Sequence, residues 1–478
     1  MTAQRWTLAV VCAATAMLML DIAVVNTALS AIADDLQTDL HGLQWVVDAY
    51  TLALATTVLT AGSLADRFGR RRFFEIGLVL FTLASIACAA STDITFLHVA
   101  RAVQGIGAAL LFAVSLALLA NAYPDMKERS GALAIYGATI GASFAVGPLV
   151  GGLLTTGIAW QWIFIINVPF GIAGLWVART YVAESKDPAA PRVDLPGQLV
   201  LTGALFLLTY ALLRGNDQGW GSTEIVAELA SAGVLLALFV AIESRVKQPM
   251  FPLKLFRNSS FTGAQLAVTA ISASFFAIFL YTTLYLQQVL GLSALQAGAV
   301  YLPATVVSFL VAGASASMLE KVSARLMIGV GLVLVASGMV AMTAAGTDSS
   351  WTVVLPGSFL ALIGTGMFNP TVSAVALGTV PPHQSGLAAG IHDTFRQAGL
   401  AVGVAGLGAL VPASEVFAGG GKAEYVSGLH DALLVGAAIA AAGAVAAFAL
   451  IRDRQLQQPQ QVEEPVAFDA QVAVAQAA

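Results

Sequence analysis

The feature that most constrains this chain is a long series of apolar runs separated by short polar segments. An α-helix needs about 20 apolar residues to cross about 30 Å of hydrocarbon. Inside a bilayer every backbone polar group must be bonded within the chain, which favours helices. We therefore expect an all-α polytopic membrane protein. The runs number about 14 and lie at 6–30, 45–64, 73–91, 95–122, 131–156, 160–182, 195–214, 224–243, 260–287, 296–318, 326–346, 352–378, 387–411 and 429–451.

The charge content supports the same conclusion and excludes several functions. Only 10% of the 478 residues are charged and 58% are hydrophobic, whereas soluble domains carry about 25% charged residues. The net charge of −5 leaves no basic surplus to neutralise phosphates, so we expect no nucleic-acid partner. The sequence contains no nucleotide-binding loop, metal-ligand cluster or triad spacing. We expect a protein that is not an enzyme and uses no metal or cofactor, and we interpret Cys12 and Cys88 as packing residues.

Lys and Arg are distributed unevenly between the two sides of the expected spans. Of the 22 basic residues, 18 fall in segments on the side of the N-terminus. Only Arg214 and Lys422 fall on the opposite side, while Arg101 and Arg396 lie within spans. Because cytoplasmic loops carry the excess of basic residues, both termini are expected in the cytoplasm.

The chain also shows an internal repeat and a linker. The loop GSLADRFGRRR at 62–72 has a degenerate copy, SMLEKVSAR, at 317–325. Each follows the second helix of a six-helix set, which suggests two related halves. The polar, proline-containing stretch at 184–196 predicts a linker between them. We expect four parts: an N-terminal six-helix bundle, a linker with two inserted helices, a C-terminal six-helix bundle and a disordered tail, at 1–183, 184–257, 258–453 and 454–478.

Several segments together resemble a known family. They are LDIAVVNTAL at 20–29, WVVDAY at 45–50, the 62–72 loop, RAVQGIG at 101–107 and GPLVGG at 147–152. These segments are similar to motifs of the major facilitator superfamily, in its branch of fourteen-helix drug:proton antiporters. TFRQ at 394–397 is similar to that branch less specifically.

The resemblance implies a fold of two six-helix bundles plus two inserted helices. It also implies a proton-coupled antiporter that exports hydrophobic or cationic drugs or antibiotics across the plasma (inner) membrane of a bacterium. The partners would be protons, the small-molecule substrate and the lipid bilayer, and the protein would act as a monomer. The alternatives are a carrier of a specific metabolite without proton antiport and a non-transporting membrane sensor.

Three charged residues in the first half are candidates for proton coupling. Asp21 lies deep in the first span, where an ionisable residue needs water, a proton or a partner. Arg101 lies well inside the fourth span, where the nearby Gln104 would allow polar contact, and the resemblance implies a role for Arg101 in proton coupling. Asp48 lies at the outer end of the second span, where entering protons would meet it. The alternatives are a neutral or hydrogen-bonded structural acid for Asp21, a side chain that reaches outward to the lipid interface or only braces helices for Arg101, and a solvated face residue for Asp48.

Two glycine-containing motifs are candidates for moving parts. The 62–72 loop would act as a gate latch, with Asp66 pairing with an Arg or capping the next helix, and with Gly62 and Gly69 allowing tight turns. The alternative is that its basic residues only set the topology. The second motif is GPLVGG at 147–152 in the fifth span. Its glycines would form a groove for a neighbouring backbone, and Pro148 would bend the helix. The resemblance implies that this helix seals the outward path. The residues concerned are Gly62, Asp66, Arg67, Gly69, Arg70 and Arg71 in the latch, and Gly147, Pro148, Gly151 and Gly152 in the groove.

The second half holds one further polar group, His392, Asp393 and Arg396. Inside the membrane these residues could join a proton path, whereas at the cytoplasmic end of their helix they would form a solvated cap, which we favour slightly. Asn369-Pro370 and Pro303 predict broken helices.

Overall fold

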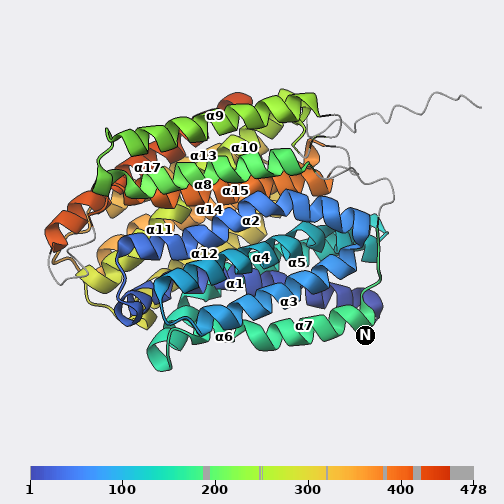
Figure 1. Cartoon of the computed structure of the whole chain (residues 1–478), viewed down its shortest axis with the longest axis horizontal. Helices are drawn as coiled ribbons and strands as arrows, with labels where there is room; N and C mark the ends of the chain where they lie inside the picture. Colours follow the sequence, from blue (N-terminus) through green and yellow to red (C-terminus); the bar gives the residue numbers. More distant parts are fainter. Residues whose placement is uncertain are drawn as a thin grey trace, which may run out of the picture.

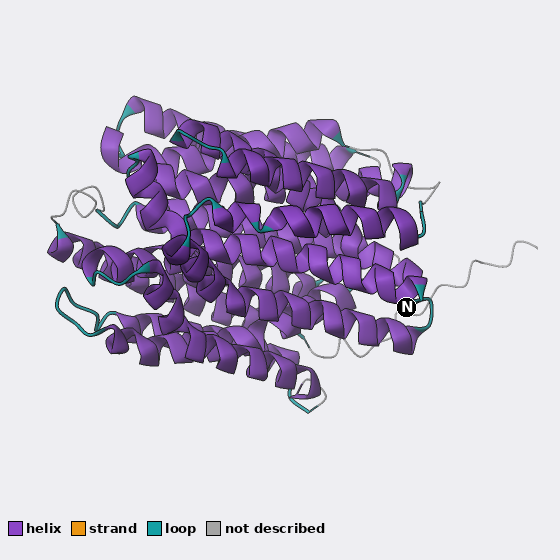
Figure 2. Cartoon of the chain, turned by 90° about the horizontal axis from the view of Figure 1, so that it is seen from below, coloured by secondary structure: helices purple, strands orange, loops and turns teal. Residues whose placement is uncertain are grey.

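The computed structural model describes residues 2–186, 194–246, 249, 251–318, 321–380, 385–412 and 421–452. The expected tail at 454–478 and residues 319–320 of the degenerate repeat lie outside these ranges. The described part is helical throughout, with long helices running side by side along one axis (Figures 1 and 2). Figure 2 shows no strand among the described residues.

The helices fall into a first half, an inserted hairpin and a second half. Those of the first half are α1 Ala3–Leu36, α2 Leu40–Phe68, α3 Arg70–Ala89, α4 Ile94–Ala122, α5 Met126–Gly157, α6 Trp162–Ile165 and α7 Asn167–Tyr181. Those of the hairpin are α8 Leu195–Gln218 and α9 Thr223–Arg245. Those of the second half are η1 Leu253–Arg257, α10 Ser259–Ile271, η2 Ser272–Phe276, α11 Ala277–Leu284, η3 Tyr285–Val289, α12 Ala294–Met318, α13 Ala324–Met342, η4 Trp351–Val354, α14 Leu355–Gly378, α15 Ser385–Gly408 and α17 Lys422–Leu450.

The two ends of the bundle are used below as reference points. The near end is the one where the N-terminus lies, at the right of Figure 1, and it holds the turn at Gly69. The far end is the opposite one, reached first by the chain at Gln37. Polar caps mark the helix starts there: Asp39 accepts a hydrogen bond from the Gly42 N–H at 3.0 Å, and Asp93 accepts one from the Phe96 N–H at 2.8 Å.

Twelve described segments are long and apolar enough to cross a membrane. Helices α5 and α15 add two long helices at positions where the sequence predicts spans. Together they match the fourteen expected runs, and the all-α polytopic prediction is confirmed. Helix boundaries differ by several residues, because polar residues at the helix ends extend α1, α2 and α17 beyond their apolar runs.

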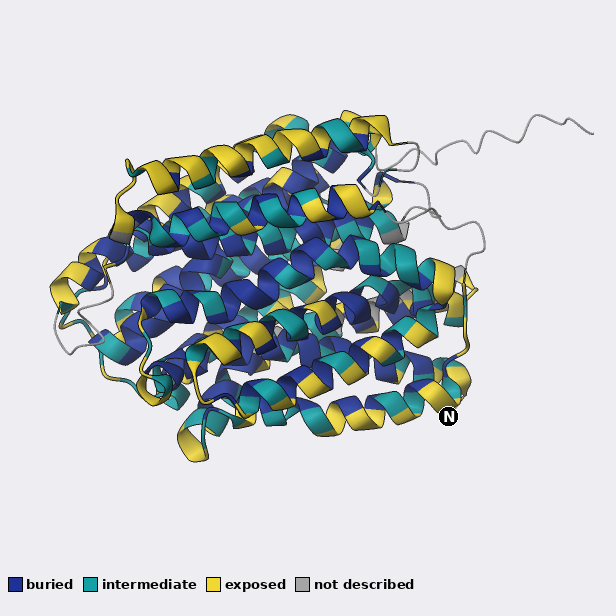
Figure 3. Cartoon of the chain, viewed as in Figure 1, coloured by how far each residue is buried: buried dark blue, intermediate teal, exposed yellow. Residues whose placement is uncertain are grey.

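Each half packs mainly within itself, and a few helices join the halves. Helix α5 packs against α12, and α2 packs against α15. Helix α8 contacts both α2 and α15, so the hairpin lies across the junction between the halves. Its second helix, α9, lies on the outside, where 17% of its most apolar window is buried against 72% in α2 (Figure 3).

The breaks in the helices are not where proline predicts them. Helices α12 and α14 pass through Pro303 and Pro370 without interruption, so the prediction of broken helices at these positions is wrong. The ninth span instead contains two π-helical segments, η2 and η3, with no proline in either. The sixth span consists of two pieces, α6 and α7. Neighbouring helices in a packed bundle re-satisfy the backbone groups that a proline frees, so proline alone does not decide where a span breaks.

Candidate functional site

A buried ion pair between Asp21 and Arg101 lies at the centre of the first half. The Nη1 of Arg101 on α4 is 2.6 Å from the Oδ2 of Asp21 on α1. The two side chains are 2% and 0% exposed. A charged pair removed from water in this way is costly to break on one side only, since the remaining charge is then buried without a partner.

Two uncharged residues, Gln104 and Asn167, also bind the Asp21 carboxylate, and a third, Ser85, binds both of them. Gln104, one turn along α4 from Arg101, accepts a hydrogen bond from Arg101 at 2.7 Å and donates to the Asp21 Oδ1 at 2.9 Å. Asn167, the first residue of α7, donates to the same Oδ1 at 3.0 Å. The Ser85 hydroxyl on α3 accepts hydrogen bonds from Gln104 at 2.9 Å and from Asn167 at 3.3 Å. The network therefore ties together α1, α3, α4 and α7.

The rest of the guanidinium is held by backbone and by aromatic rings. The Arg101 Nε donates to the Val46 carbonyl on α2 at 3.0 Å. The guanidinium carbon lies 4.4 Å from the centre of the Tyr50 ring and 5.7 Å from that of Phe164. These contacts desolvate and fix the cation. A residue that only reached outward to the lipid interface would not be held in this way, and Arg101 instead braces α1, α2 and α4 around Asp21.

Asp48 is separate from this network. It is fully buried, and neither of its carboxylate oxygens has a hydrogen-bond partner. The interpretation of Asp48 as a solvated face residue is therefore wrong. One turn earlier on α2, the Gln44 Nε2 donates to the Tyr281 hydroxyl on α11 at 2.7 Å, and that hydroxyl donates to the Val404 carbonyl on α15. Asp48 thus lies beside a polar contact that crosses between the halves.

The groove predicted on α5 is present at the far end. A Cβ added to Gly151 would lie 2.8 Å from the Val24 backbone of α1, and one added to Gly152 would lie 2.6 Å from the Leu295 Cα of α12. Gly147 faces Ala23 of α1 at closer range still, and the Pro148 carbonyl packs against Gly298 of α12. Small residues thus allow α5 to touch both α1 of the first half and α12 of the second half backbone to backbone.

The 62–72 segment differs in part from the expected loop. Asp66 pairs with Arg70, with the Oδ1 and Nε 2.7 Å apart, and Gly69 has φ of 121°, the left-handed geometry that favours glycine. Gly62 lies inside α2, so the tight turn expected there is wrong.

The basic residues of this segment face the near end. Arg67 is exposed, and its guanidinium carbon lies 5.6 Å from the centre of the Phe68 ring. Glu184, which the sequence places only at the start of the linker, accepts hydrogen bonds from the Arg71 and Arg72 N–H groups at 3.0 and 3.2 Å. It therefore caps α3 and fastens the end of the first half to this turn.

In the second half, His392, Asp393 and Arg396 lie within α15 rather than forming a solvated cap, so that interpretation is wrong. His392 is 6% exposed, and its Nδ1 is 3.1 Å from the Gln265 Oε1 on α10. Asp393 pairs with Arg396, whose guanidinium carbon lies 5.8 Å from the centre of the Phe112 ring in the first half. The pair therefore faces the other half across the junction.

Comparison with known proteins identifies the family. The family model described as Major Facilitator Superfamily matches residues 11–404. The chain belongs to the Major Facilitator Superfamily. It is therefore a multi-pass membrane transporter, as the resemblance in its motifs implied.

Relatives within the superfamily include bacterial resistance proteins. The Multidrug resistance protein Stp of Mycobacterium tuberculosis is 37% identical over 400 residues, which are 83% of this chain and 74% of the relative. The Puromycin resistance protein pur8 of Streptomyces alboniger is 35% identical over 407 residues, 84% of this chain and 80% of the relative.

Solved structures share the superfamily fold. A peptide transporter, POT, in complex with sulfate has a TM-score of 0.66 at 16% identity, covering 93% of this chain and 95% of that one. A bacterial homologue of the human lysosomal transporter Spinster, inward-facing and unoccupied, has a TM-score of 0.62 at 15% identity, covering 96% and 99%. At such identities the likeness concerns the fold alone.

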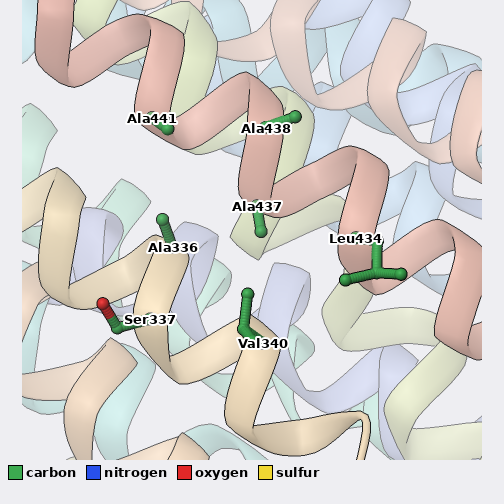
Figure 4. Close-up of a pocket in the computed structure, with 7 residues that line it drawn as sticks. All are labelled: Ala336, Ser337, Val340, Leu434, Ala437, Ala438 and Ala441. Carbon is green, nitrogen blue, oxygen red and sulfur yellow. The ribbon is translucent and has the colours of Figure 1, made fainter.

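One surface hollow lies away from these polar sites. It lies between α13 and α17 and is lined by small, mostly aliphatic residues that include Ala336, Val340 and Ala438 (Figure 4). Ser337 is the single polar residue lining it. A shallow apolar depression on the outer face of a superfamily member is suited to lipid chains.

Sequence reasoning found the charged residues and Gln104, which lies one turn after Arg101 on the same helix face. It missed Ser85 and Asn167, which are small polar residues inside apolar runs, as are many others that serve only local backbone bonds. Gln198 on α8 was missed as well: its Oε1 accepts a hydrogen bond from the Thr60 hydroxyl on α2 at 2.6 Å.

Proposed function

We propose that this superfamily member is a proton-coupled antiporter that exports small hydrophobic or cationic drugs or antibiotics. The names of the relatives, which describe multidrug and puromycin resistance, support the substrate class. The single observation that carries the coupling is the buried Asp21–Arg101 pair, because a carboxylate at this depth can exchange a proton for its cationic partner.

The proposed coupling runs from Asp21 to the far-end closure along α1. Protonation of Asp21 would remove its charge and weaken its bond to Arg101, which also holds α2 through the Val46 carbonyl. Ala23 and Val24, within one turn of Asp21 on α1, contact the α5 glycines, and Gln287 of η3 donates to the Thr27 carbonyl at 3.0 Å. A shift of α1 would therefore act on the contacts that join the halves at the far end.

The remaining predicted residues take supporting roles in this proposal. The latch of Gly62, Asp66, Arg67, Gly69, Arg70 and Arg71 would fix the near end in one of the two states, and Gly147, Pro148, Gly151 and Gly152 would seal the far end. His392, Asp393 and Arg396 would contribute to the substrate path from the second half. Asp48 would be a second proton site beside the Gln44–Tyr281 contact. We place the protein in the bacterial plasma membrane as a monomer, with both termini in the cytoplasm.

Transport in inverted vesicles tests the proposal. Vesicles from a host that lacks its own pumps and expresses this chain should accumulate a cationic dye when a proton gradient is applied. An uncoupler should abolish the accumulation, and the Asp21→Asn variant should show none. Uptake that ignores the gradient would favour the metabolite carrier, and saturable binding without flux would favour the sensor.

The Asp48→Asn variant tests an effect on proton-driven transport separately from an effect on folding. Because neither Asp48 oxygen has a bonding partner, the substitution breaks no contact, and the variant should be as abundant and as thermally stable as the wild type. If Asp48 carries a proton, dye accumulation driven by the gradient should fall at least several-fold. Unchanged transport would remove Asp48 from the proposed path and leave Asp21 as the proposed proton site.

A further inference from the structure

Two carboxyl groups outside the proposed transport path meet at the near end of the inserted hairpin. Asp194 precedes α8, is 5% exposed and accepts a hydrogen bond from the Gly197 N–H through its Oδ1 at 3.0 Å. Glu243 lies in the last turn of α9, is 3% exposed and accepts one from the Phe251 N–H through its Oε2 at 3.0 Å. One oxygen of each group is thus occupied by a backbone donor.

The other two oxygens are directed at the same place. Among the described residues, neither the buried Asp194 Oδ2 nor the buried Glu243 Oε1 accepts a hydrogen bond from a donor group. A Cβ added to Gly197 would lie 2.8 Å from the first and 2.9 Å from the second, so both crowd one point. The two side chains lie within hydrogen-bonding reach of one another. Two carboxylates held this close repel unless one of them is protonated.

No described cation relieves this repulsion. The described basic residues of α9 and η1 are Arg245, Lys254 and Arg257, and all three are exposed. Arg214, the basic residue of α8, pairs with Glu228 near the other end of the hairpin. Within the described ranges, neither carboxyl group forms an ion pair with a basic residue. Asp194 is the charged group that acts on Glu243.

We propose that Asp194 and Glu243 form a proton-binding carboxyl pair that clasps the base of the α8–α9 hairpin. A proton fits this site and a metal cation does not, because the pair offers only two free oxygens, whereas Ca²⁺ takes six to eight oxygen ligands and Mg²⁺ six. With one shared proton the two groups are joined by a hydrogen bond, and without it they push α8 and α9 apart.

The location gives this clasp a consequence for the whole molecule. Asp194 lies where the chain enters the hairpin from the first half, and Glu243 binds the backbone of Phe251, where the chain leaves for the second half. The Phe251 ring packs on Phe395 of α15 with centroids 5.8 Å apart. Since α8 contacts both α2 and α15, the clasp holds the hairpin across the junction that must shift when the halves move.

The pH dependence of stability tests the pair on the purified full chain. The folded pair retains a proton that two separated carboxyl groups would lose, so the melting temperature of the wild type should fall as the pH is raised from about 5.5 to about 9. In Glu243→Gln an amide replaces the shared proton, and this fall should become smaller. Asp194→Asn should flatten it equally, since asparagine still caps α8. The double variant should flatten it no further, because the proton belongs to the pair.

Glu224→Gln is the matched control. This glutamate lies on the same helix, is 70% exposed and should keep the wild-type slope. Infrared spectroscopy gives a second measurement: one protonated-carboxyl band should disappear on alkaline titration of the wild type and be missing from either pair variant. Wild-type slopes in both pair variants, or slopes that change additively in the double variant, would overturn the proposal. So would lower melting temperatures with an unchanged slope, since these would mean that the pair only packs.

Discussion

Two buried carboxylates in the first half, Asp21 and Asp48, have opposite surroundings. Asp21 accepts hydrogen bonds from Arg101, Gln104 and Asn167, whereas Asp48 has no partner for either oxygen. Replacing Asp21 therefore breaks hydrogen bonds that stabilise the fold, whereas replacing Asp48 breaks none. This difference allows stability and transport to be measured separately.

We expect Asp21→Asn to destabilise the folded protein as well as to stop transport. It leaves the Arg101 guanidinium buried without a counter-charge, and breaking one side of a buried pair costs about 3–5 kcal/mol. The double variant Asp21→Asn/Arg101→Gln should recover part of the lost stability, because no buried charge remains, but should not recover transport. Thermal melting in detergent measures the first effect and dye accumulation the second. A double variant less stable than both single variants would contradict the pairing.

The residues around Asp21 also show how much of the site the sequence can predict. Asp21 and Arg101 are each identifiable because a charge inside an apolar run is expensive. Their contact is not, since 80 residues separate them and the packing of α1 against α4 decides which faces meet. Asn167 and Ser85 carry no charge and stand out only once that packing is known. The same applies to the acid pair of the hairpin, whose members lie 49 positions apart at the ends of different helices.

At the scale of the element, the glycines of α5 near the far end touch neighbouring helices, whereas a glycine nearer the middle of α5 touches none. Gly151 and Gly152 have backbone atoms of α1 and α12 within 3 Å of where a Cβ would lie, whereas Gly137 has nothing within 4 Å. The spacing of glycines in the sequence predicts a groove, but it does not predict which glycines contact a neighbouring helix. That depends on the turn at which α12 crosses α5.

Matched alanine substitutions on α5 test this assignment. Gly152→Ala should destabilise the protein by about 1–3 kcal/mol and reduce transport, because the new Cβ would collide with the Leu295 backbone. Gly137→Ala should leave stability unchanged or raise it by up to about 1 kcal/mol, since alanine favours a helix more than glycine does. Melting temperatures of the two variants provide the comparison. Equal destabilisation of both would mean that α5 does not approach α12 as described.

The ninth span shows a second limit at this scale. Its π-helical segments, η2 and η3, occur without proline, whereas α12 and α14 continue through theirs. Hydropathy identifies a span because insertion into the bilayer depends on the apolar composition of the segment, which can be read from the sequence. Departures from regular helix geometry depend on the neighbouring helices, which for this span are chiefly α15 and α17, more than a hundred residues further along the chain.

At the scale of the whole molecule, the fold follows from the sequence more completely than the site does. The number of spans follows from the apolar runs, and the two halves with the inserted hairpin follow from the repeated loop and the polar linker. The contact of α8 with both halves could not be predicted from hydropathy, because α9 is the more apolar helix of the hairpin and yet the less buried one.

The orientation in the membrane remains a prediction of the basic-residue distribution. In a Cys12→Ala/Cys88→Ala background, Asp34→Cys places a thiol at an exposed far-end position and Arg72→Cys places one at an exposed near-end position. In intact cells a membrane-impermeant maleimide should label the Asp34→Cys variant and spare the Arg72→Cys variant, because the sequence predicts 18 of the 22 basic residues on the side of the N-terminus. Permeabilised cells should label both. The reverse pattern would place the termini outside.

Among the described residues, the groups that bind the Asp21 carboxylate or the Arg101 side chain belong to α1, α2, α4, α6 and α7, all of which precede the hairpin. Recombination between related genes at the hairpin would thus transfer this assembly as one intact unit. A gene that gained a new second half in this way would keep the complete assembly around Asp21 and Arg101 in its first half.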